Sequence, residues 1–212
     1  MKNNQFGRSM IEMLGVLAII AVLSVGGIAG YSKAIQMYKL NKWKSDFVMM
    51  TANLKTVFIN SRSYSEVKET DLTNFFKGLN IMPQNFLTSY NKDVFGNTIK
   101  IYARDDKKEN SRFGLNDSHL TIQIKTLPNQ NAVKQCMALM EMVQEHDDAW
   151  FTILNEDTLG INYSFSVCGK SAPTLFAKYE KCIPFNISEV AVKCAICAKQ
   201  KCDIKFCLSN GY

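Results

Sequence analysis

An apolar run from Met13 to Tyr31 constrains this 212-residue chain more than any other stretch. Before Tyr31 its only polar side chain is that of Ser24, and one carboxylate, Glu12, stands directly in front of it. As a helix these 19 residues would rise about 28 Å, close to the roughly 30 Å hydrocarbon core of a bilayer. The run therefore predicts a helix of membrane-spanning length, and an ionisable group at its edge is a candidate functional residue.

The residues in front of the run form a short polar leader, Met1 to Phe6, followed by Gly7, and Glu12 is the fifth residue after that glycine. From Gly7 to about Lys33 this arrangement resembles the N-terminus of type IV prepilins and of type II secretion pseudopilins. The resemblance implies that a prepilin peptidase cuts after Gly7, that Arg8 becomes the N-methylated first residue, and that Glu12 is the assembly carboxylate. Arg8 departs from the family pattern, in which this residue is usually apolar.

All seven cysteines lie in the last 77 positions. They are Cys136, Cys168, Cys182, Cys194, Cys197, Cys202 and Cys207. A cytosolic domain rarely carries so many cysteines without a metal, whereas an exported domain pairs them, so the cysteines predict an extracytoplasmic head with disulfide bonds. Lys33, Lys39, Lys42 and Lys44 follow the apolar run, and the positive-inside rule alone favours the opposite orientation. The cysteines and the leader outweigh that rule here.

We predict that Cys136, on one face of an expected helix, pairs with Cys168, at the end of an expected strand, although sequence does not fix connectivity. The other five cysteines are an odd number, which leaves a thiol unpaired or paired between molecules. Cys194-x-x-Cys197 also fits a zinc site, but a second CxxC is missing, so disulfides are favoured. Redox chemistry is disfavoured because a redox CxxC opens a helix, whereas this one lies inside a helix expected over 188–200 and capped by Ser188.

The sequence has no proline before Pro83, so nothing interrupts a helix that begins near Ser9. Beyond the run, apolar residues recur mostly at every third or fourth position, which is typical of an amphipathic helix. These residues are Tyr31, Ile35, Tyr38, Trp43, Phe47, Met50, Leu54 and Phe58. We predict one helix of about 50 residues whose first half is apolar all round and whose second half packs on a head.

The remaining pattern predicts short elements. Residues 71–78 are typical of a short helix ended by Gly78. Residues 98–103 and 120–125 alternate apolar with polar side chains, as half-buried strands do. A helix is expected over 132–145 and further strands over 150–154 and 162–167. The predicted fold class is α+β, with the long N-terminal helix packed on a small antiparallel β-sheet head that carries a cysteine-rich C-terminal region.

We divide the chain by these patterns into six regions. They are a prepilin leader (1–7), a transmembrane or filament-core helix (8–31), the amphipathic half of that helix (32–60), a connecting loop region (61–97), an α+β head (98–181) and a cysteine-rich C-terminal region (182–212).

The sequence carries no motif of enzyme chemistry. It has two histidines, His119 and His146, and no glycine-rich phosphate loop, HExxH or GxSxG. We therefore predict no catalytic residue, metal ligand or cofactor. The net charge of +6 is diffuse, and the lysines of the C-terminal region are not interleaved with aromatic residues, so nucleic acid is not an expected partner.

Taken together, these patterns favour a structural subunit, a pilin or minor pilin, polymerised through its N-terminal helix. The resemblance implies as partners a prepilin peptidase, other pilin subunits, and the inner membrane before assembly into a surface filament or periplasmic pseudopilus. A pseudopilin of type II secretion is a variant of this hypothesis. The alternative from another class is a single-pass anchored binding module that keeps residues 1–7 and does not polymerise.

Overall fold

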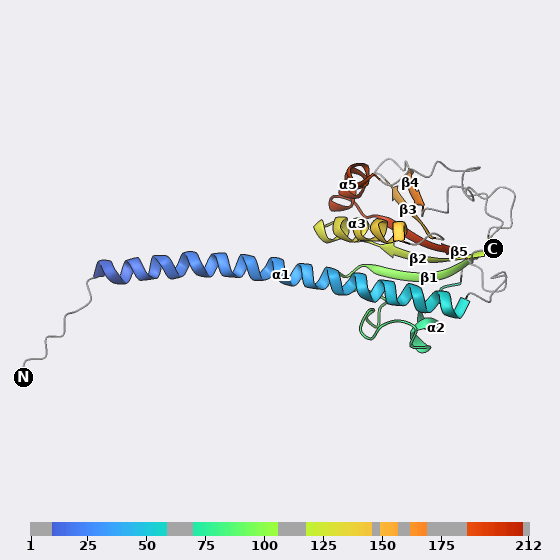
Figure 1. Cartoon of the computed structure of the whole chain (residues 1–212), viewed down its shortest axis with the longest axis horizontal. Coiled ribbons are helices and arrows are strands. Elements are labelled where there is room, and N and C mark those ends of the chain that lie inside the picture. Colours follow the sequence, from blue (N-terminus) through green and yellow to red (C-terminus); the bar gives the residue numbers. More distant parts are fainter. Residues whose placement is uncertain are drawn as a thin grey trace, which may run out of the picture. The chain divides into compact units, whose positions relative to one another are not determined.

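The structure is a computed structural model, and it describes residues 10–58, 70–105, 118–145, 149–156, 162–168 and 186–209 (Figure 1). The chain divides into two compact units, Met1–Lys42 and Trp43–Tyr212. We call the second unit the head. Helix α1 (Met10–Phe58) begins in the first unit and ends in the head.

Helix α1 has 49 residues, which confirms the prediction of one long helix that begins near Ser9. The hydroxyl group of Ser24, which lies within the apolar run, is satisfied inside the helix, because Ser24 Oγ donates to the carbonyl oxygen of Ile20 at 2.7 Å. The predicted apolar face of α1 is buried within the head. Its residues there whose side chains the structure describes are Trp43, Phe47, Met50 and Leu54. Tyr31 and Tyr38, in the first unit, are exposed. The burial of this face in the head therefore begins at Trp43.

The head contains one five-stranded sheet in which every pairing is antiparallel. Its strands are β1 (Thr98–Asp105), β2 (Ser118–Lys125), β3 (Ala149–Glu156), β4 (Asn162–Cys168) and β5 (Asp203–Ser209), in the spatial order β1-β2-β5-β3-β4. The four strands predicted from the sequence are confirmed. The strand β5 was not predicted, and it occupies the centre of the sheet (Figure 1).

The described helices of the head are the end of α1, α2 (Thr73–Gly78), α3 (Gln130–Glu145) and α5 (Ile187–Ala195), which continues into the 3₁₀ turn η2 (Ile196–Ala198). The N-cap of α5 is Asn186, whose side chain accepts from the backbone N–H of Ser188, so the predicted Ser188 cap is wrong. Helix α2 ends at Gly78 as expected. The left-handed residue of its C-terminus, however, is Asn80, with a φ of 53°.

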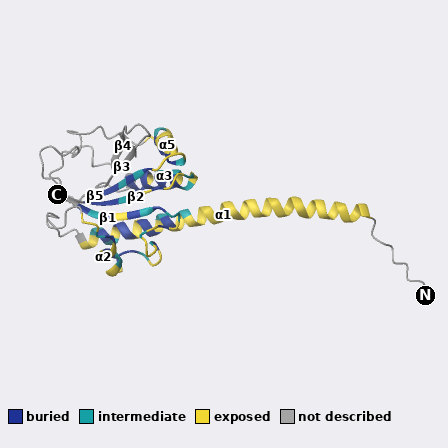
Figure 2. Ribbon diagram, turned by 180° about the vertical axis from the view of Figure 1, so that it is seen from behind, coloured by how far each residue is buried: buried dark blue, intermediate teal, exposed yellow. Residues whose placement is uncertain are grey.

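One face of the sheet forms the core, because alternate residues of its strands point the same way. Ile101 of β1 pairs with Ile122 of β2, which pairs with Phe206 of β5, and all three are fully buried. The ring of Phe47 in α1 contacts that of Phe206. Figure 2 shows the buried residues gathered on β1, β2, β5, α3 and the final part of α1. The predicted α+β fold, a long helix packed on an antiparallel sheet, is confirmed.

The described part of the predicted connecting region, residues 70–97, packs into the head. Its backbone pairs with the outer edge of β1, where Leu72 N donates to Ile101 O at 2.8 Å and Ile99 N donates to Asn91 O at 2.8 Å. Phe86 joins the hydrophobic core. The segment therefore covers an edge strand, which would otherwise present unpaired backbone groups.

Candidate functional site: the apolar part of helix α1 and the disulfide-bridged head

The first unit presents an extended apolar surface. From Met10 to Ile28 every large apolar side chain that the structure describes is between 52% and 84% exposed. The most apolar window of the helix has a mean hydropathy of 2.4, and none of that window is buried (Figure 2). Soluble monomers rarely expose more than a few hundred Å² of contiguous apolar surface. By its length and composition this helix is able to cross a membrane.

Glu12 lies in the first turn of α1 and is exposed. Its neighbours Ile11 and Met13 are exposed apolar residues, so the carboxylate stands at the beginning of the apolar surface. A negative charge in this turn interacts favourably with the helix dipole. Gly7 and Arg8 lie outside the described residues, so cleavage after Gly7 and methylation of Arg8 stay predictions.

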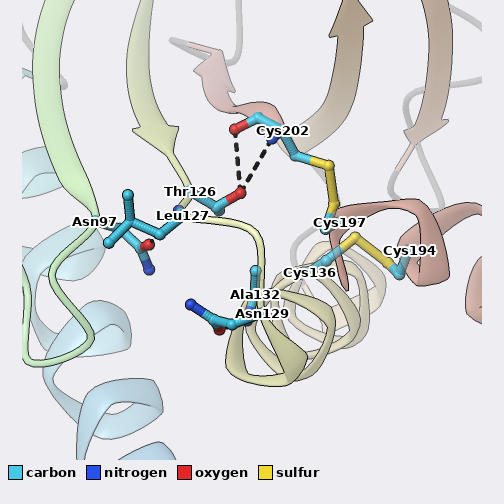
Figure 3. Close-up of a disulfide and its surroundings, with 9 residues drawn as sticks. All are labelled: Asn97, Thr126, Leu127, Asn129, Ala132, Cys136, Cys194, Cys197 and Cys202. Atoms are coloured by element: carbon cyan, nitrogen blue, oxygen red, sulfur yellow. Dashed lines mark hydrogen bonds between the residues drawn. A yellow bond between two sulfur atoms is a disulfide. The ribbon is translucent and has the colours of Figure 1, made fainter. Parts of the chain in front are cut away.

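Two described disulfides organise the C-terminal region of the head. Cys136 of α3 is bonded to Cys194 of α5, with an S–S distance of 2.00 Å and a Cα–Cα distance of 5.7 Å. Cys197 of η2 is bonded to Cys202, which directly precedes β5, with an S–S distance of 2.02 Å. All four residues are buried. The predicted formation of disulfides in this region is confirmed (Figure 3).

The predicted pairing of Cys136 with Cys168 is wrong. The buried face of α5, which carries Val190 and Cys194, lies against α3 and brings the Cys194 sulfur to that of Cys136. The sequence placed Cys136 correctly on a buried face of its helix, but the element that covers this position is α5 rather than β4. The side chain of Cys168 and the whole of Cys182 lie outside what the structure describes.

The CxxC motif is divided between the two disulfides, because Cys194 and Cys197 each bond to a distant cysteine and not to each other. This pairing withholds both sulfurs from a zinc ion or a redox dithiol. Among the described residues no group of three or more histidine, cysteine or acidic side chains is placed to hold a metal ion. The seventh cysteine, Cys207, carries a buried thiol whose Sγ lies 3.7 Å from Thr121 Oγ1.

Hydrogen bonds also hold the segment from Cys197 to Cys202 against the connection between β2 and α3. Thr126 N donates to Cys202 O at 2.9 Å. Cys202 N donates to Thr126 Oγ1 at 3.1 Å (Figure 3). Asn129 N donates to Cys197 O at 3.2 Å. These bonds fix the point at which the chain enters the centre of the sheet as β5.

A buried polar network, which sequence reasoning missed, joins the loop before β1 to helix α3. Its members are Asp93, Asn97 and Gln135, of which none is more than 3% exposed. Gln135 Nε2 donates to Asp93 Oδ2 at 2.7 Å, and the backbone N–H groups of Phe95 and Asn97 donate to Asp93 Oδ1 at 2.9 Å each. Asn97 Oδ1 accepts from Leu127 N at 2.9 Å. The network therefore connects three segments of the head.

Burial raises the pKa of Asp93 above its usual value, although hydrogen bonds from Gln135, Asn97 and Phe95 act in the opposite direction. The sequence offered one signal for part of this network. Asp93 stands three residues before Gly96, whose φ is +83°, and an aspartate before such a glycine is typical of a turn. Nothing in the sequence pointed to Gln135, which lies 42 residues further on.

A salt bridge also links two helices of the head. Lys44 Nζ of α1 lies 2.6 Å from Glu141 Oε2 of α3. Lys44, which is among the lysines that follow the apolar run, therefore has a carboxylate partner in the head. Of the two histidines, His119 lies in β2, where it is in register with Ser209 of β5, and His146 lies outside the described residues.

In comparisons with known proteins, no family model, curated protein or solved structure matches this chain. The class that its own structure defines is an α+β protein with a disulfide-bridged head and one helix that is able to cross a membrane.

Proposed function

We propose that the protein is a structural subunit of a type IV pilus-like filament, processed after Gly7 and polymerised through the apolar part of α1. The observation that supports this most strongly is the dual character of one helix. From Met10 to Ile28 the helix exposes apolar side chains and bears Glu12 in its first turn, and from Trp43 onward it is part of the core of the head.

The apolar part of α1 supplies the driving force for assembly. Each Å² of apolar surface withdrawn from water contributes roughly 25 cal/mol, so the exposed side chains favour either a bilayer or neighbouring copies of the same helix. The precursor is held in the inner membrane by this helix. After cleavage, it leaves the bilayer and packs among the helices of other pilin subunits.

Glu12 sets the register of that packing. Removal of residues 1–7 by a prepilin peptidase creates a new α-amine on Arg8, which pairs with Glu12 of a neighbouring subunit. A subunit that is displaced along the filament axis would leave Glu12 unpaired. Because an unpaired charge in an apolar environment is strongly unfavourable, such a subunit does not assemble stably. The head coats the filament, and its role is structural rather than catalytic.

A pseudopilin of type II secretion uses the same mechanism and is included in this proposal. A membrane-anchored binding module is the second candidate function. It is supported by the length and hydropathy of α1, which a membrane anchor requires as much as a filament subunit does. The two proposals differ in the fate of residues 1–7. The anchored module keeps them, whereas the filament subunit loses them.

The experiment that separates the two proposals is mass spectrometry of the mature N-terminus, on protein sheared from the cell surface and on protein from the membrane. A filament subunit begins at Arg8 in the sheared fraction, with or without an N-methyl group. A chain that begins at Met1 and is confined to the membrane fraction contradicts the filament proposal and favours the anchored module.

A further inference from the structure

The disulfide between Cys136 and Cys194 joins residues that are 58 positions apart and passes over two other cysteines, Cys168 and Cys182. We infer that this head requires a disulfide isomerase, a thiol–disulfide exchange enzyme of the compartment in which the head folds. The inference concerns a partner of the folding chain and rests on the proposed function only for the extracytoplasmic location of the head.

Chain statistics favour the wrong partners before the head folds. Cys182 and Cys194 are 12 positions apart, against 58 for the native pair. Because the probability that two points of a flexible chain meet falls as about the 3/2 power of their separation, Cys194 meets Cys182 about ten times as often as it meets Cys136. Cys197 and Cys202 lie nearer still in the chain and compete for Cys194 as well. By the same rule, Cys136 meets Cys168 roughly twice as often as it meets Cys194.

Export adds to this bias. The part of the chain that carries Cys136, Cys168 and Cys182 precedes Cys194, so the three cysteines reach an oxidising compartment before the native partner of Cys136 does. Dithiol oxidases of such a compartment supply the oxidising equivalents, and they join the thiols that are nearest at that moment. The first bridges are therefore expected to be local.

In the folded head the sulfur atoms of the native bridge are out of reach of other thiols. Cys136 and Cys194 are both fully buried, and α5 and η2 are packed against α3. Thiol–disulfide exchange requires a thiolate to reach a sulfur atom, which the native packing excludes. A wrong bridge at either residue also keeps α5 from the position that it takes on α3. Rearrangement must therefore take place while the C-terminal region is still open.

The conversion of a wrong bridge into the native one consumes no oxidant. The isomerase thiolate attacks the Cys194 sulfur of a Cys182–Cys194 bridge, the S–S bond breaks, and Cys182 leaves as a thiolate. The Cys136 thiolate then attacks Cys194 in the mixed disulfide and displaces the isomerase thiolate. One protein disulfide has replaced another, and the isomerase is regenerated.

The test uses the purified full chain in detergent. The chain is reduced and unfolded, then diluted into a glutathione redox buffer with or without a disulfide isomerase of the CxxC type. Samples are alkylated at intervals and digested, and the bridged peptides are quantified by mass spectrometry. Trypsin cleaves after Lys181 and Lys193, so Cys182 and Cys194 fall on separate peptides. Cys194 and Cys197 share the peptide that ends at Lys199, and fragment-ion spectra identify which of the two is bridged. A glutamate-specific protease separates Cys136 from Cys168 by cutting at Glu145.

Without isomerase, we expect Cys194 to be bridged to Cys182 about tenfold more often than to Cys136 at the earliest times. The isomerase is expected to speed the appearance of the Cys136–Cys194 bridge at least fivefold. The control is the variant in which the other five cysteines are replaced by serine, so that Cys136 and Cys194 have no competitor and the acceleration is expected to fall below twofold.

Two outcomes overturn the inference. One is a Cys136–Cys194 bridge that predominates from the first samples without isomerase, a measurement that needs no variant. The other is an acceleration by the isomerase that is as large in the variant that keeps only Cys136 and Cys194 as in the natural chain. Neither readout involves filament assembly, so a failure here is distinct from a failure of the proposed function.

Discussion

Phe47 of α1 meets Phe206 of β5 edge to face, with their ring centroids 5.3 Å apart and their planes at 90°. Both side chains are fully buried. The contact joins residues 159 positions apart in the sequence and holds the last turns of the long helix against the central strand of the sheet.

Replacement of Phe47 by alanine is therefore expected to destabilise the head by about 3–5 kcal/mol, the usual effect of removing a buried aromatic side chain. Thermal unfolding of the detergent-solubilised chain, followed by near-ultraviolet circular dichroism, measures the effect. The matched control is Met49→Ala on the same helix, because Met49 is 50% exposed and its loss is expected to change stability by less than about 1 kcal/mol. Equal destabilisation by the two variants would contradict the placement of this helix face in the core.

Substitution of Glu12 by leucine or glutamine is expected to prevent filament formation without altering the head. Both changes remove the charge that we propose to pair with the new N-terminus, and glutamine also keeps the size of the side chain. Electron microscopy of sheared fractions measures assembly, and the melting temperature of the head is expected to be unchanged. Ser24→Leu, an apolar change on the same helix, is the control that should still assemble. Normal filaments from Glu12→Gln would exclude the charge-pairing mechanism.

Loss of the two described disulfides is expected to have unequal effects. In the chain-entropy description, the stabilisation grows with the loop that a bridge closes. The Cys136–Cys194 bridge spans 58 positions and should contribute about 4 kcal/mol, whereas Cys197–Cys202 spans 5 and should contribute about 2 kcal/mol. Thermal unfolding of the two double alanine variants makes the comparison. A larger loss from the Cys197/Cys202 pair would rule out loop closure as the main source of stabilisation.

The buried carboxyl group of Asp93 is expected to make stability depend on pH. Its pKa in the folded head is raised by burial, so the folded state holds the proton more tightly than the unfolded state does. The resulting stabilisation is complete below the ordinary carboxyl pKa and is lost as the pH rises through the raised pKa. The melting temperature of the natural chain, measured relative to that of Asp93→Asn from pH 3.5 to 7, should therefore fall with increasing pH. A difference that is constant over this range would contradict the raised pKa.

The elements that the sequence predicted well are those with a local periodic signal. The absence of proline and the three-to-four spacing from Trp43 to Leu54 were sufficient for α1, and strict alternation was sufficient for β1 and β2. In β5 the same alternation is present, since Ile204, Phe206 and Leu208 are buried on one side of the sheet. Cys202 and Cys207, which precede and interrupt this stretch, predict a disulfide-bridged region and hide the pattern of a strand.

Features that depend on distant partners were beyond the reach of a single sequence. The position of β5 between β2 and β3, the pairing of Cys136 with Cys194, and the link from Gln135 to Asp93 all join segments that are far apart in the chain. Each depends on how complete elements pack, and no local pattern of residues encodes that arrangement. The exposure of Glu12 on an apolar helix, by contrast, follows directly from its position at the start of the run.

The central position of β5 determines when the head is able to fold. Strands β1 and β2 pair with each other, as do β3 and β4, but β2 and β3 meet only through β5. Until Asp203–Ser209 has been synthesised, the sheet consists of two separate hairpins, which are marginally stable at best. Under the proposed function the head crosses a membrane, and a fold completed by the latest of its described strands leaves the chain open during that passage, which is the state that translocation through a narrow channel requires.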